Sequence, residues 1–354
     1  MSQRIAYIDI AKGIGILLVV LAHNGLQLVS PFLHQLIYAF HMPLFFFLSG
    51  MFFKPEIGFW ELLKKRFNSL LLPYFFAIFL IYFFEIFLGK MGLPIAWGRI
   101  VKSFYGNGFF LDWVAMWFLP ALFVMNLVAF VFYRLFGRFN LPWIRWIALA
   151  VMQAIGVLTL STFLSFDLNL FGRSIALQGL PFSLDLALVG GFFFILGREV
   201  YRNVPEGWFT PWWVTLGSAG LLLGLLWFSP GMIDLNTRRW DEPLLNTLKA
   251  LTGIVLVLTI SQQLARGPSW PIRFFSYMGR ISVLILIFHN PVQSYLTGKL
   301  GWLIGEGALT LILVDFFAVL VSVIIYEIGV RPNPLVTRLF GMKSEQTRTS
   351  VNLA

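Results

Sequence analysis

Residues 4–24 read RIAYIDIAKGIGILLVVLAHN, an apolar run with a lysine in its first half and a histidine near its end. A membrane-spanning helix needs about 20 mostly apolar residues. The apolar run from 11 to 29 is long enough for this, and it is too long for the apolar part of a cleavable signal. It also lacks a small-residue cleavage site, so the sequence predicts a permanent first span.

The rest of the chain repeats this pattern. Of its 354 residues, 58% are hydrophobic and 12% charged, whereas a soluble domain has about 25% charged residues. The predicted spans are 11–29, 36–53, 70–88, 114–133, 144–164, 182–197, 211–228, 244–264, 281–297 and 308–330. The fold is therefore expected to be all-α, a polytopic membrane protein with about ten transmembrane helices. One domain is expected over 1–340, followed by a polar, disordered cytoplasmic tail at 341–354.

The basic residues indicate the orientation. The formal net charge is +10, but the lysines and arginines fall in short loops between apolar runs instead of forming one basic surface. This distribution argues against a nucleic-acid partner, and the positive-inside rule places both termini in the cytoplasm. Segment 56–69 mixes aromatic and basic residues, which favours an amphipathic helix on the inner membrane surface.

The chain has four histidines, and His23, His41 and His289 lie inside predicted spans. A polar residue at bilayer depth is a candidate functional group, although each histidine could instead be a packing residue. His23 and His41 each lie nine residues from a predicted outer turn near Phe32. Antiparallel helices joined there would hold both rings at a similar depth, and His34 in the turn would be solvated.

Lys12 precedes His23 by eleven residues. On a helix this is three turns plus about 20°, so both side chains share one face, about 16 Å apart. A cation near the inner end and a base deep in the membrane suit a long anionic donor that enters from inside. Asp9 is placed to pair with Lys12; alternatively, Lys12 only extends to the inner interface. The buried acids Asp185 and Asp315 are expected to pair with basic residues on other spans.

Several motifs resemble one known family. The basic residue, ten residues and histidine of Lys12–His23 match the opening pattern of the acyltransferase-3 family of membrane O-acyltransferases, with lysine where arginine is common. FHMPLFFFLSGMFF (40–53) is similar to the family's second span, and KKRFNSLLLPY (64–74) to its basic motif, although Ser69 replaces a frequent second arginine. MWFLPALF (116–123) and IFHNPV (287–292) also resemble family segments. The chain is most similar to the branch with fucose O-acetylase-like and Nod-factor acetyltransferases.

The resemblance implies about ten spans, an acyl-CoA donor and a glycan or lipid acceptor. Transfer to a hydroxyl needs a base, and the tetrahedral intermediate needs hydrogen-bond donors. The expected catalytic residues are His23, His41, Asn24, Lys12 and Asp9. The expected donor-binding residues are Lys64, Lys65, Arg66 and Arg138, and the expected substrate-binding residues are Ser49, Trp117, His289 and Asn290. Trp117 could stack on a sugar face or anchor the chain at the interface.

These features predict an O-acetyltransferase that uses acetyl-CoA and a sugar hydroxyl of a surface polysaccharide, glycolipid or related glycan. Its expected location is the plasma membrane, here a bacterial inner membrane. The chain has no cysteine, which excludes a cysteine nucleophile, and no metal is expected. The alternatives are a transporter or flippase for a glycan or lipid-linked sugar, an O-succinyltransferase of the same family, or a subunit of a polysaccharide export complex. A covalent acetyl-histidine route also stays open.

Overall fold

The computed structural model describes residues 3–137, 139, 142–170, 173–205 and 207–342. The described helices are α1 (Gln3–Ala22), α2 (Leu26–Val29), α3 (Pro31–Tyr38), α4 (His41–Gly50), α5 (Phe59–Arg66), α6 (Leu72–Phe87), α7 (Leu93–Ser103), α8 (Phe118–Phe136), α9 (Pro142–Thr159), α10 (Ala187–Asn203), α11 (Trp212–Phe228), α12 (Pro243–Leu264), α13 (Ser269–Arg280), α14 (Ser282–Ile304), α15 (Ala308–Ile324) and α16 (Pro334–Leu339). Short 3₁₀ or π segments lie at Phe67–Leu71, Gly108–Phe110, Val114–Trp117, Leu160–Phe163, Pro181–Leu186 and Ile325–Val330.

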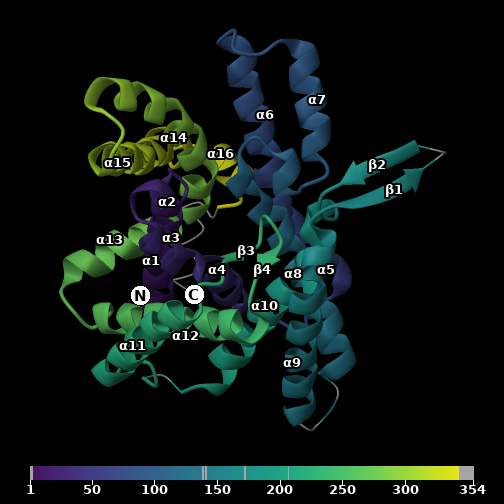
Figure 1. The fold of residues 1–354 in the computed structure, drawn as a ribbon, viewed down its shortest axis with the longest axis vertical. Helices are drawn as coiled ribbons and strands as arrows, with labels where there is room; N and C mark the ends of the chain where they lie inside the picture. The colour runs from purple at the N-terminus through teal and green to yellow at the C-terminus, as the bar shows by residue number, and fades with distance from the viewer. Residues whose placement is uncertain (1–2, 138, 140–141, 171–172, 206, 343–354) are drawn as a thin grey trace.

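Two small antiparallel hairpins accompany the helices, and the sequence patterns did not predict either. They pair β1 (Phe166–Leu170) with β2 (Arg173–Leu177) and β3 (Ile233–Asp234) with β4 (Arg239–Trp240). The β1–β2 hairpin projects away from the helices, whereas β3–β4 lies among them near the centre of the view (Figure 1). The fold is otherwise all-α, as expected.

Seven helical segments are long and apolar enough to cross a membrane, or eight if the bent pair α13–α14 is one span. They coincide with the predicted spans at 36–53, 70–88, 114–133, 144–164, 182–197, 244–264 and 308–330. Helix α11 is apolar but short, and α1 carries charges in its first half. The structure therefore shows a multi-pass membrane protein, and the predicted total of ten spans is not reached by length and composition alone.

The predicted first span differs in its bounds. Helix α1 begins at Gln3 and ends at Ala22, where the predicted span was 11–29. The chain turns at Gly25, whose φ of 91° lies in the left-handed region that favours glycine. The expected short turn near Phe32 is instead helix α3. Within segment 56–69 the helix begins at Phe59 and runs on into α6, so this part is one arm of the long helical segment Phe59–Phe87.

Glycines allow two helix pairs to pack with their backbones in close approach. A Cβ on Gly13 of α1 would overlap a backbone carbonyl of α13, and a Cβ on Gly279 of α13 would overlap the carbonyl of Asp9 on α1. Gly50 of α4 and Gly197 of α10 make the same reciprocal arrangement. Small residues at such interfaces are the usual means of close packing between membrane helices. They fix α1, which His23 follows directly, and α4, which begins at His41.

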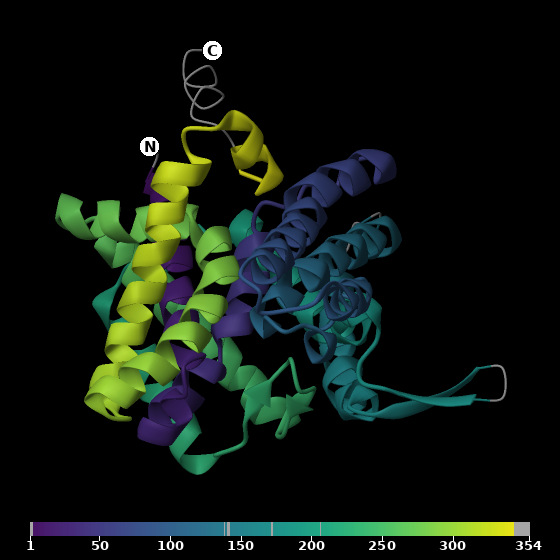
Figure 2. The same cartoon turned by 90° about the horizontal axis from the view of Figure 1, so that it is seen from above.

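The two ends of the molecule differ. The first turn of α1 and helix α16 lie at one end, and the β3–β4 hairpin lies at the opposite end (Figure 2). His23 follows the last residue of α1, so it lies toward the hairpin end. Lys12 lies nearer the end that holds the start of the chain.

Candidate active site

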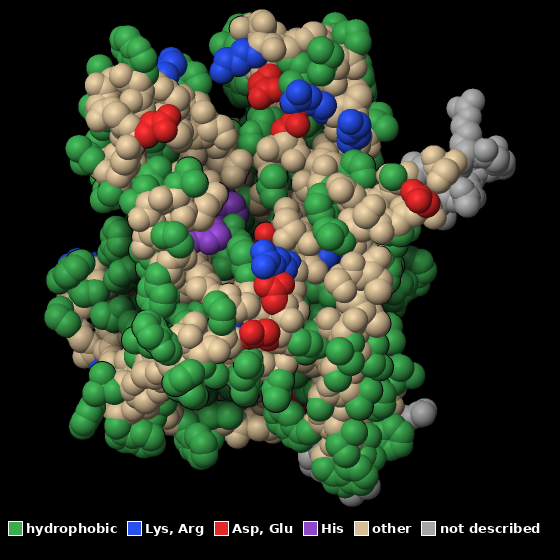
Figure 3. Space-filling model, in the orientation of Figure 1, with side chains coloured by type: hydrophobic (Ala, Val, Ile, Leu, Met, Phe, Trp, Pro, Cys, Tyr) green, Lys and Arg blue, Asp and Glu red, His purple; other side chains and the backbone are tan. Residues whose placement is uncertain are grey.

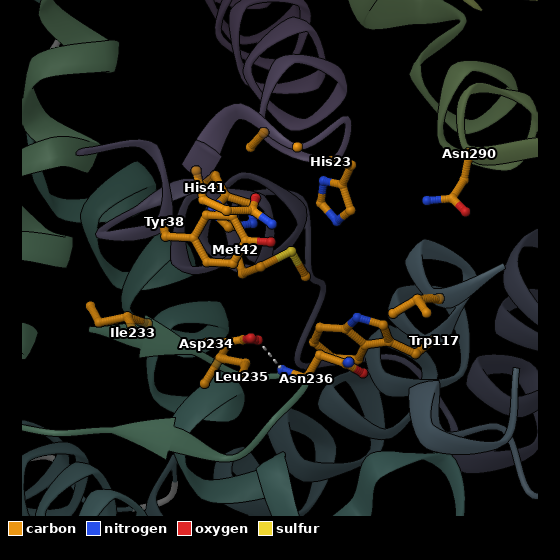
Figure 4. Close-up of a pocket in the computed structure, with 14 residues that line it drawn as sticks. His23, Tyr38, His41, Met42, Trp117, Ile233, Asp234, Leu235, Asn236 and Asn290 are labelled. Atoms are coloured by element: carbon orange, nitrogen blue, oxygen red, sulfur yellow. Dashed lines mark hydrogen bonds between the residues drawn. The ribbon is translucent and has the colours of Figure 1, made fainter. Parts of the chain in front are cut away.

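A cavity of about 280 Å³ lies between the end of α1 and the β3–β4 hairpin. Its lining includes His23, Tyr38, His41, Met42, Trp117, Asp234, Asn236 and Asn290. In Figure 4 the hairpin residues form the wall opposite His23, with Tyr38, His41 and Met42 on one side. Histidine side chains are visible in a hollow of the surface on this face (Figure 3). The cavity therefore brings residues from distant parts of the chain against His23.

His23 presents a basic nitrogen to this cavity. Its Nδ1 lies 2.8 Å from the carbonyl oxygen of Val19. A carbonyl oxygen only accepts hydrogen bonds, so Nδ1 carries the proton and donates it to Val19. The neutral ring then has its lone pair on Nε2, which is the atom a general base uses.

Two further histidines adopt the same tautomer for the same reason. The Nδ1 atom of His41 lies 3.0 Å from the carbonyl of Ile37, and that of His289 lies 2.8 Å from the carbonyl of Ile285. The His23 ring centroid is 6.3 Å from that of His41 and 5.6 Å from that of His289. The expected meeting of His23 and His41 is thus found, and His289 joins them from α14.

This tautomer limits what His41, one of the expected catalytic residues, can do for an oxyanion. An oxyanion needs an N–H or O–H donor, but neutral His41 offers a lone pair on Nε2 and uses its N–H on Ile37. His41 can donate to an oxyanion only after it gains a proton. Neutral donors that line the cavity include the side-chain amides of Asn236 and Asn290.

Tyr38 lies between the histidines, and sequence reasoning did not single it out. Its ring centroid is 4.7 Å from that of His41 and 4.1 Å from that of His34. It also stacks on His23 at 6.3 Å with an interplanar angle of 28°. His34 is half-buried on α3, where the sequence predicted a solvated turn. The two rings of α3 therefore help to hold the histidines in place.

The wall opposite His23 is polar. One oxygen of the Asp234 carboxylate accepts hydrogen bonds from the backbone N–H groups of Asn236, at 2.9 Å, and Thr237, at 3.3 Å. This arrangement closes the turn of the hairpin and leaves the second carboxylate oxygen free of these bonds. Asp234 and Asn236 both line the cavity, so the hairpin supplies a carboxylate and an amide to it.

A buried ion pair holds this hairpin in position. The Arg238 guanidinium donates to both oxygens of Asp185, with Nε at 2.5 Å and Nη2 at 3.0 Å. Both side chains are 0% exposed, and Arg238 also donates to the backbone carbonyl of Asn236 at 2.6 Å. Asp185 was expected to pair with a basic residue of another span; it has a basic partner, but that partner lies in the hairpin. Arg238 thereby connects the start of α10 to the cavity wall.

The backbone around this pair is strained. Phe182, Ser183 and Arg238 have φ values of 55°, 53° and 57°, in the left-handed region that such residues rarely adopt. Strain of this kind persists where the surroundings over-determine the conformation, and it clusters at functional sites. The left-handed turn at Phe182–Ser183 immediately precedes Asp185.

A second layer of polar residues surrounds the ion pair. The Asn107 amide donates to the carbonyl of Gln178 at 2.8 Å, and the Tyr105 hydroxyl donates to that of Gly179 at 2.8 Å. Burial and the nearby Asp185 carboxylate raise the pKa of Tyr105, so its hydroxyl keeps its proton and the bond. The segment before α10 is therefore tied to the segment before α8.

The hairpin is also anchored at its start. Lys249 of α12 is fully buried and donates to the carbonyls of Ser229, at 2.5 Å, and Gly231, at 3.1 Å. It forms a further hydrogen bond with Asn246 and an ion pair with Glu242 at 3.7 Å. A buried ammonium is costly unless its protons are bound, and here the hairpin supplies the acceptors.

Two predicted substrate residues reach the cavity and two do not. Trp117 and Asn290 line it, whereas His289 is buried behind His23. Ser49 lines a different cavity, which it shares with Lys12. The reason is that Ser49 lies more than two helical turns beyond His41 on α4, on the side away from the hairpin.

Asn24 and Asp315 belong to a polar cluster behind the cavity. The Asn24 amide donates to the carbonyl of Leu311 at 3.1 Å, and Gln293 donates to Asp315 at 2.7 Å and to the carbonyl of Val20 at 2.8 Å. The sequence predicted a basic partner for Asp315, whereas the structure shows the Gln293 amide donating to it. Gln293 reaches both α1 and α15, so this cluster fixes where α1 ends.

Among the expected donor-binding residues, Lys64 and Lys65 are exposed at the end of α5, and Arg66 is half-buried. The Nε atom of Arg66 is buried without a hydrogen-bond partner among the described residues. Arg138 lies outside the described residues. Lys12 lies 5.4 Å from the ring centroid of Phe52. Its pairing with Asp9 stays a prediction.

Sequence reasoning missed Asp234, Asn236, Arg238 and Lys249. One signal was present: residues 229–243 form a loop with Asp234, Arg238, Arg239, Asp241 and Glu242 between two apolar runs. A charge-rich loop is normally read as solvated, and only the fold shows that it turns inward to the histidines.

Comparison with known proteins supports a family assignment. The family model described as an acyltransferase domain (Acyl_transf_3) matches residues 5–327. Among curated proteins and among solved structures, no match to the chain was found.

Proposed function

Because the chain belongs to the acyltransferase-3 family and is a multi-pass membrane acyltransferase, we propose that it moves an acetyl group from acetyl-CoA to a sugar hydroxyl. The acceptor is a surface polysaccharide, a glycolipid or a related glycan, and the membrane is a bacterial inner membrane. The lining of the cavity supports the proposal of a sugar acceptor. Trp117 offers an aromatic face, and hydrogen-bonding groups are offered by Asp234, Asn236 and Asn290. Few precisely placed polar groups around an apolar surface are typical of such sites.

His23 is the general base in this proposal. The observation that carries it is the Nδ1–H···O bond to Val19, which leaves the Nε2 lone pair for the acceptor hydroxyl. A hydroxyl is a weak nucleophile at neutral pH, so removal of its proton during attack is the main chemical requirement. Val19 therefore orients the ring, and His23 takes the proton.

The proposed transfer needs no reactant other than acetyl-CoA and the acceptor hydroxyl. The acceptor oxygen forms a bond to the thioester carbon as His23 takes the hydroxyl proton. The amides of Asn236 or Asn290 donate to the resulting oxyanion. The carbon–sulfur bond then breaks, and the protonated His23 returns the proton to the leaving thiolate of coenzyme A. This gives the acetyl ester and free coenzyme A.

The two substrates approach from opposite ends. The acceptor reaches the cavity from the hairpin end, which is the outer face if both termini are cytoplasmic. The donor approaches from the end that holds Lys12, where Lys64, Lys65 and Arg66 supply positive charge for the phosphates of coenzyme A. Arg138 is proposed as a further contact from its place in the sequence. Asp9 holds Lys12.

The absence of cysteine gives a direct test. Release of coenzyme A can be followed with a thiol reagent in purified protein, because the chain itself has no thiol. With acetyl-CoA and a panel of glycans, we expect release to depend on the acceptor and to fall about 10²–10⁴-fold in His23→Ala. Full-rate release by His23→Ala would overturn the assignment of the base. Acceptor transport without coenzyme A release would favour the transporter alternative.

A further inference from the structure

A second cavity lies on the Lys12 side of the histidines. Its volume is about 130 Å³, and it is lined by Lys12 and Ser49 together with apolar side chains from α1, α4, α8 and α14. The ammonium of Lys12 and the hydroxyls of Ser49 and Ser282 are its polar groups. A narrow apolar passage with a few hydrogen-bonding groups suits a slender chain that contains amides.

Met42 is the residue that the two cavities share. It lines the cavity of His23 and also that of Lys12, and no other described residue lines both. It follows His41 in the first turn of α4, and its side chain extends beside the His23 cavity (Figure 4). Met42 therefore forms the partition between a cavity that reaches toward the inner end and one that faces the hairpin.

The neighbouring residues place the partition next to the reacting groups. Val19 lines the Lys12 cavity, and its carbonyl accepts the hydrogen bond from His23. Trp117 lines the His23 cavity, and the next residue, Phe118, lines the Lys12 cavity. The two cavities are thus back to back, about one side chain apart.

Methionine suits a partition that must open. Its side chain is unbranched, with three rotatable bonds, so it can change conformation with little cost in packing. A rotation of Met42 would join the two cavities and bring a thioester in the Lys12 cavity beside His23. The space that this rotation frees is small because Phe45 and Phe118 line the same cavity.

On the basis of the proposed function, we propose that the Lys12 cavity holds the thioester arm of acyl-CoA and that Met42 limits the size of the acyl group that reaches His23. An acetyl group passes the partition. A longer acyl group meets the Met42 side chain and is excluded.

The test measures selectivity rather than activity alone. The kcat/KM values for acetyl-, propionyl- and butyryl-CoA are compared in the wild type, Met42→Ala and Met42→Leu. An apolar pocket distinguishes substrates that differ by one methylene by about 10–200-fold in kcat/KM. Met42→Ala should therefore raise the ratio of the butyryl-CoA to the acetyl-CoA kcat/KM by at least about tenfold. Met42→Leu keeps the volume and should change the ratio less than about threefold. An unchanged ratio in Met42→Ala would overturn the proposal.

A matched control truncates another residue of the acceptor cavity. Val114 lines the His23 cavity and not the Lys12 cavity. Val114→Ala should leave the acyl ratio within about threefold of the wild type, and a change as large as that of Met42→Ala would assign selectivity to the whole cavity. If the wild type releases no coenzyme A from any thioester, the proposed function itself fails.

Chemical protection tests the path independently of turnover. Met42→Cys would be the single thiol of the chain. Its labelling by a small maleimide is measured with and without desulfo-coenzyme A, which has no thiol of its own. We expect at least about fivefold slower labelling with the ligand. Equal labelling rates at saturating ligand would show that the arm does not pass Met42.

Discussion

At the scale of single residues, the protonation of each histidine follows from one hydrogen bond. In His23, His41 and His289, Nδ1 lies against the carbonyl four residues earlier in the chain. Each ring therefore offers a lone pair at Nε2. Only His23 and His41 line the acceptor cavity, and the question is which of them removes the proton.

The His23 substitution by glutamine separates hydrogen bonding from proton transfer. Glutamine keeps a polar group near the cavity but cannot accept a proton, so His23→Gln should lose about 10²–10⁴-fold in kcat, as His23→Ala does. His41→Ala should be milder, since its loss removes a neighbour of the base. The measurement is kcat at saturating acetyl-CoA. A larger loss in His41→Ala than in His23→Gln would exchange their roles, and radiolabel retained on His23 without acceptor would favour the covalent route.

At the scale of elements, α1 and α4 are held by their glycines. A Cβ on Gly50 would overlap the carbonyl oxygen of Phe194, so α4 and α10 would have to separate. Overpacking of this kind costs about 1–3 kcal/mol. We expect Gly50→Ala to lower the thermal transition of the purified protein by several degrees.

Helix α11 offers the matched control. A Cβ on Gly217 would meet no atom within 4 Å, so Gly217→Ala should leave the transition unchanged or raise it slightly. Equal destabilisation by both substitutions would mean that close approach of α4 and α10 is not what Gly50 provides.

The hairpin depends in the same way on its ion pair. Removal of one member of a buried pair leaves an uncompensated charge and typically costs 3–5 kcal/mol. Arg238→Met should therefore destabilise the β3–β4 hairpin and raise the acceptor KM, because Arg238 also holds the carbonyl of Asn236. Asp185→Asn combined with Arg238→Met should be less harmful than the sum of the two changes. Additive losses, or an unchanged acceptor KM, would contradict this link.

At the scale of the whole molecule, both ends of the described chain lie on one side (Figure 2). That this side is cytoplasmic stays a prediction from the distribution of basic residues. Single cysteines test the orientation, since the chain has none of its own. In intact cells, an impermeant thiol reagent should label Asn236→Cys and spare Lys65→Cys. External labelling at position 65 would invert the topology.

Local patterns were sufficient for most of the fold, because apolar runs predicted most spans. The predicted meeting of His23 and His41 is found, although the turn at Phe32 that it assumed is helix α3. Both inferences use residues close together in the sequence. The 74° bend between α13 and α14 and the end of α1 at Ala22 depend on packing. Neither can therefore be predicted from a local run of residues.

The site was harder to predict, because its second half is distant in the sequence. Asp234 and Asn236 lie about two hundred residues from His23, and nothing in a charged loop shows that it folds inward. For the same reason, the basic partner of Asp185 was expected on another span, whereas it is Arg238 of the hairpin. Asp315 was expected to need a cation, whereas the amide of Gln293 already supplies a hydrogen bond.

The ion pair also sets an order of events during synthesis. Asp185 precedes Arg238 by 53 residues. A ribosome adds about 5–20 residues per second, so Arg238 is synthesised about 3–10 s after Asp185. During that interval Asp185 must stay in water or carry a proton, and the start of α10 cannot settle into its final place. The wall opposite His23 is therefore completed only after α11 has been synthesised. The cavity accordingly forms late during synthesis of the chain.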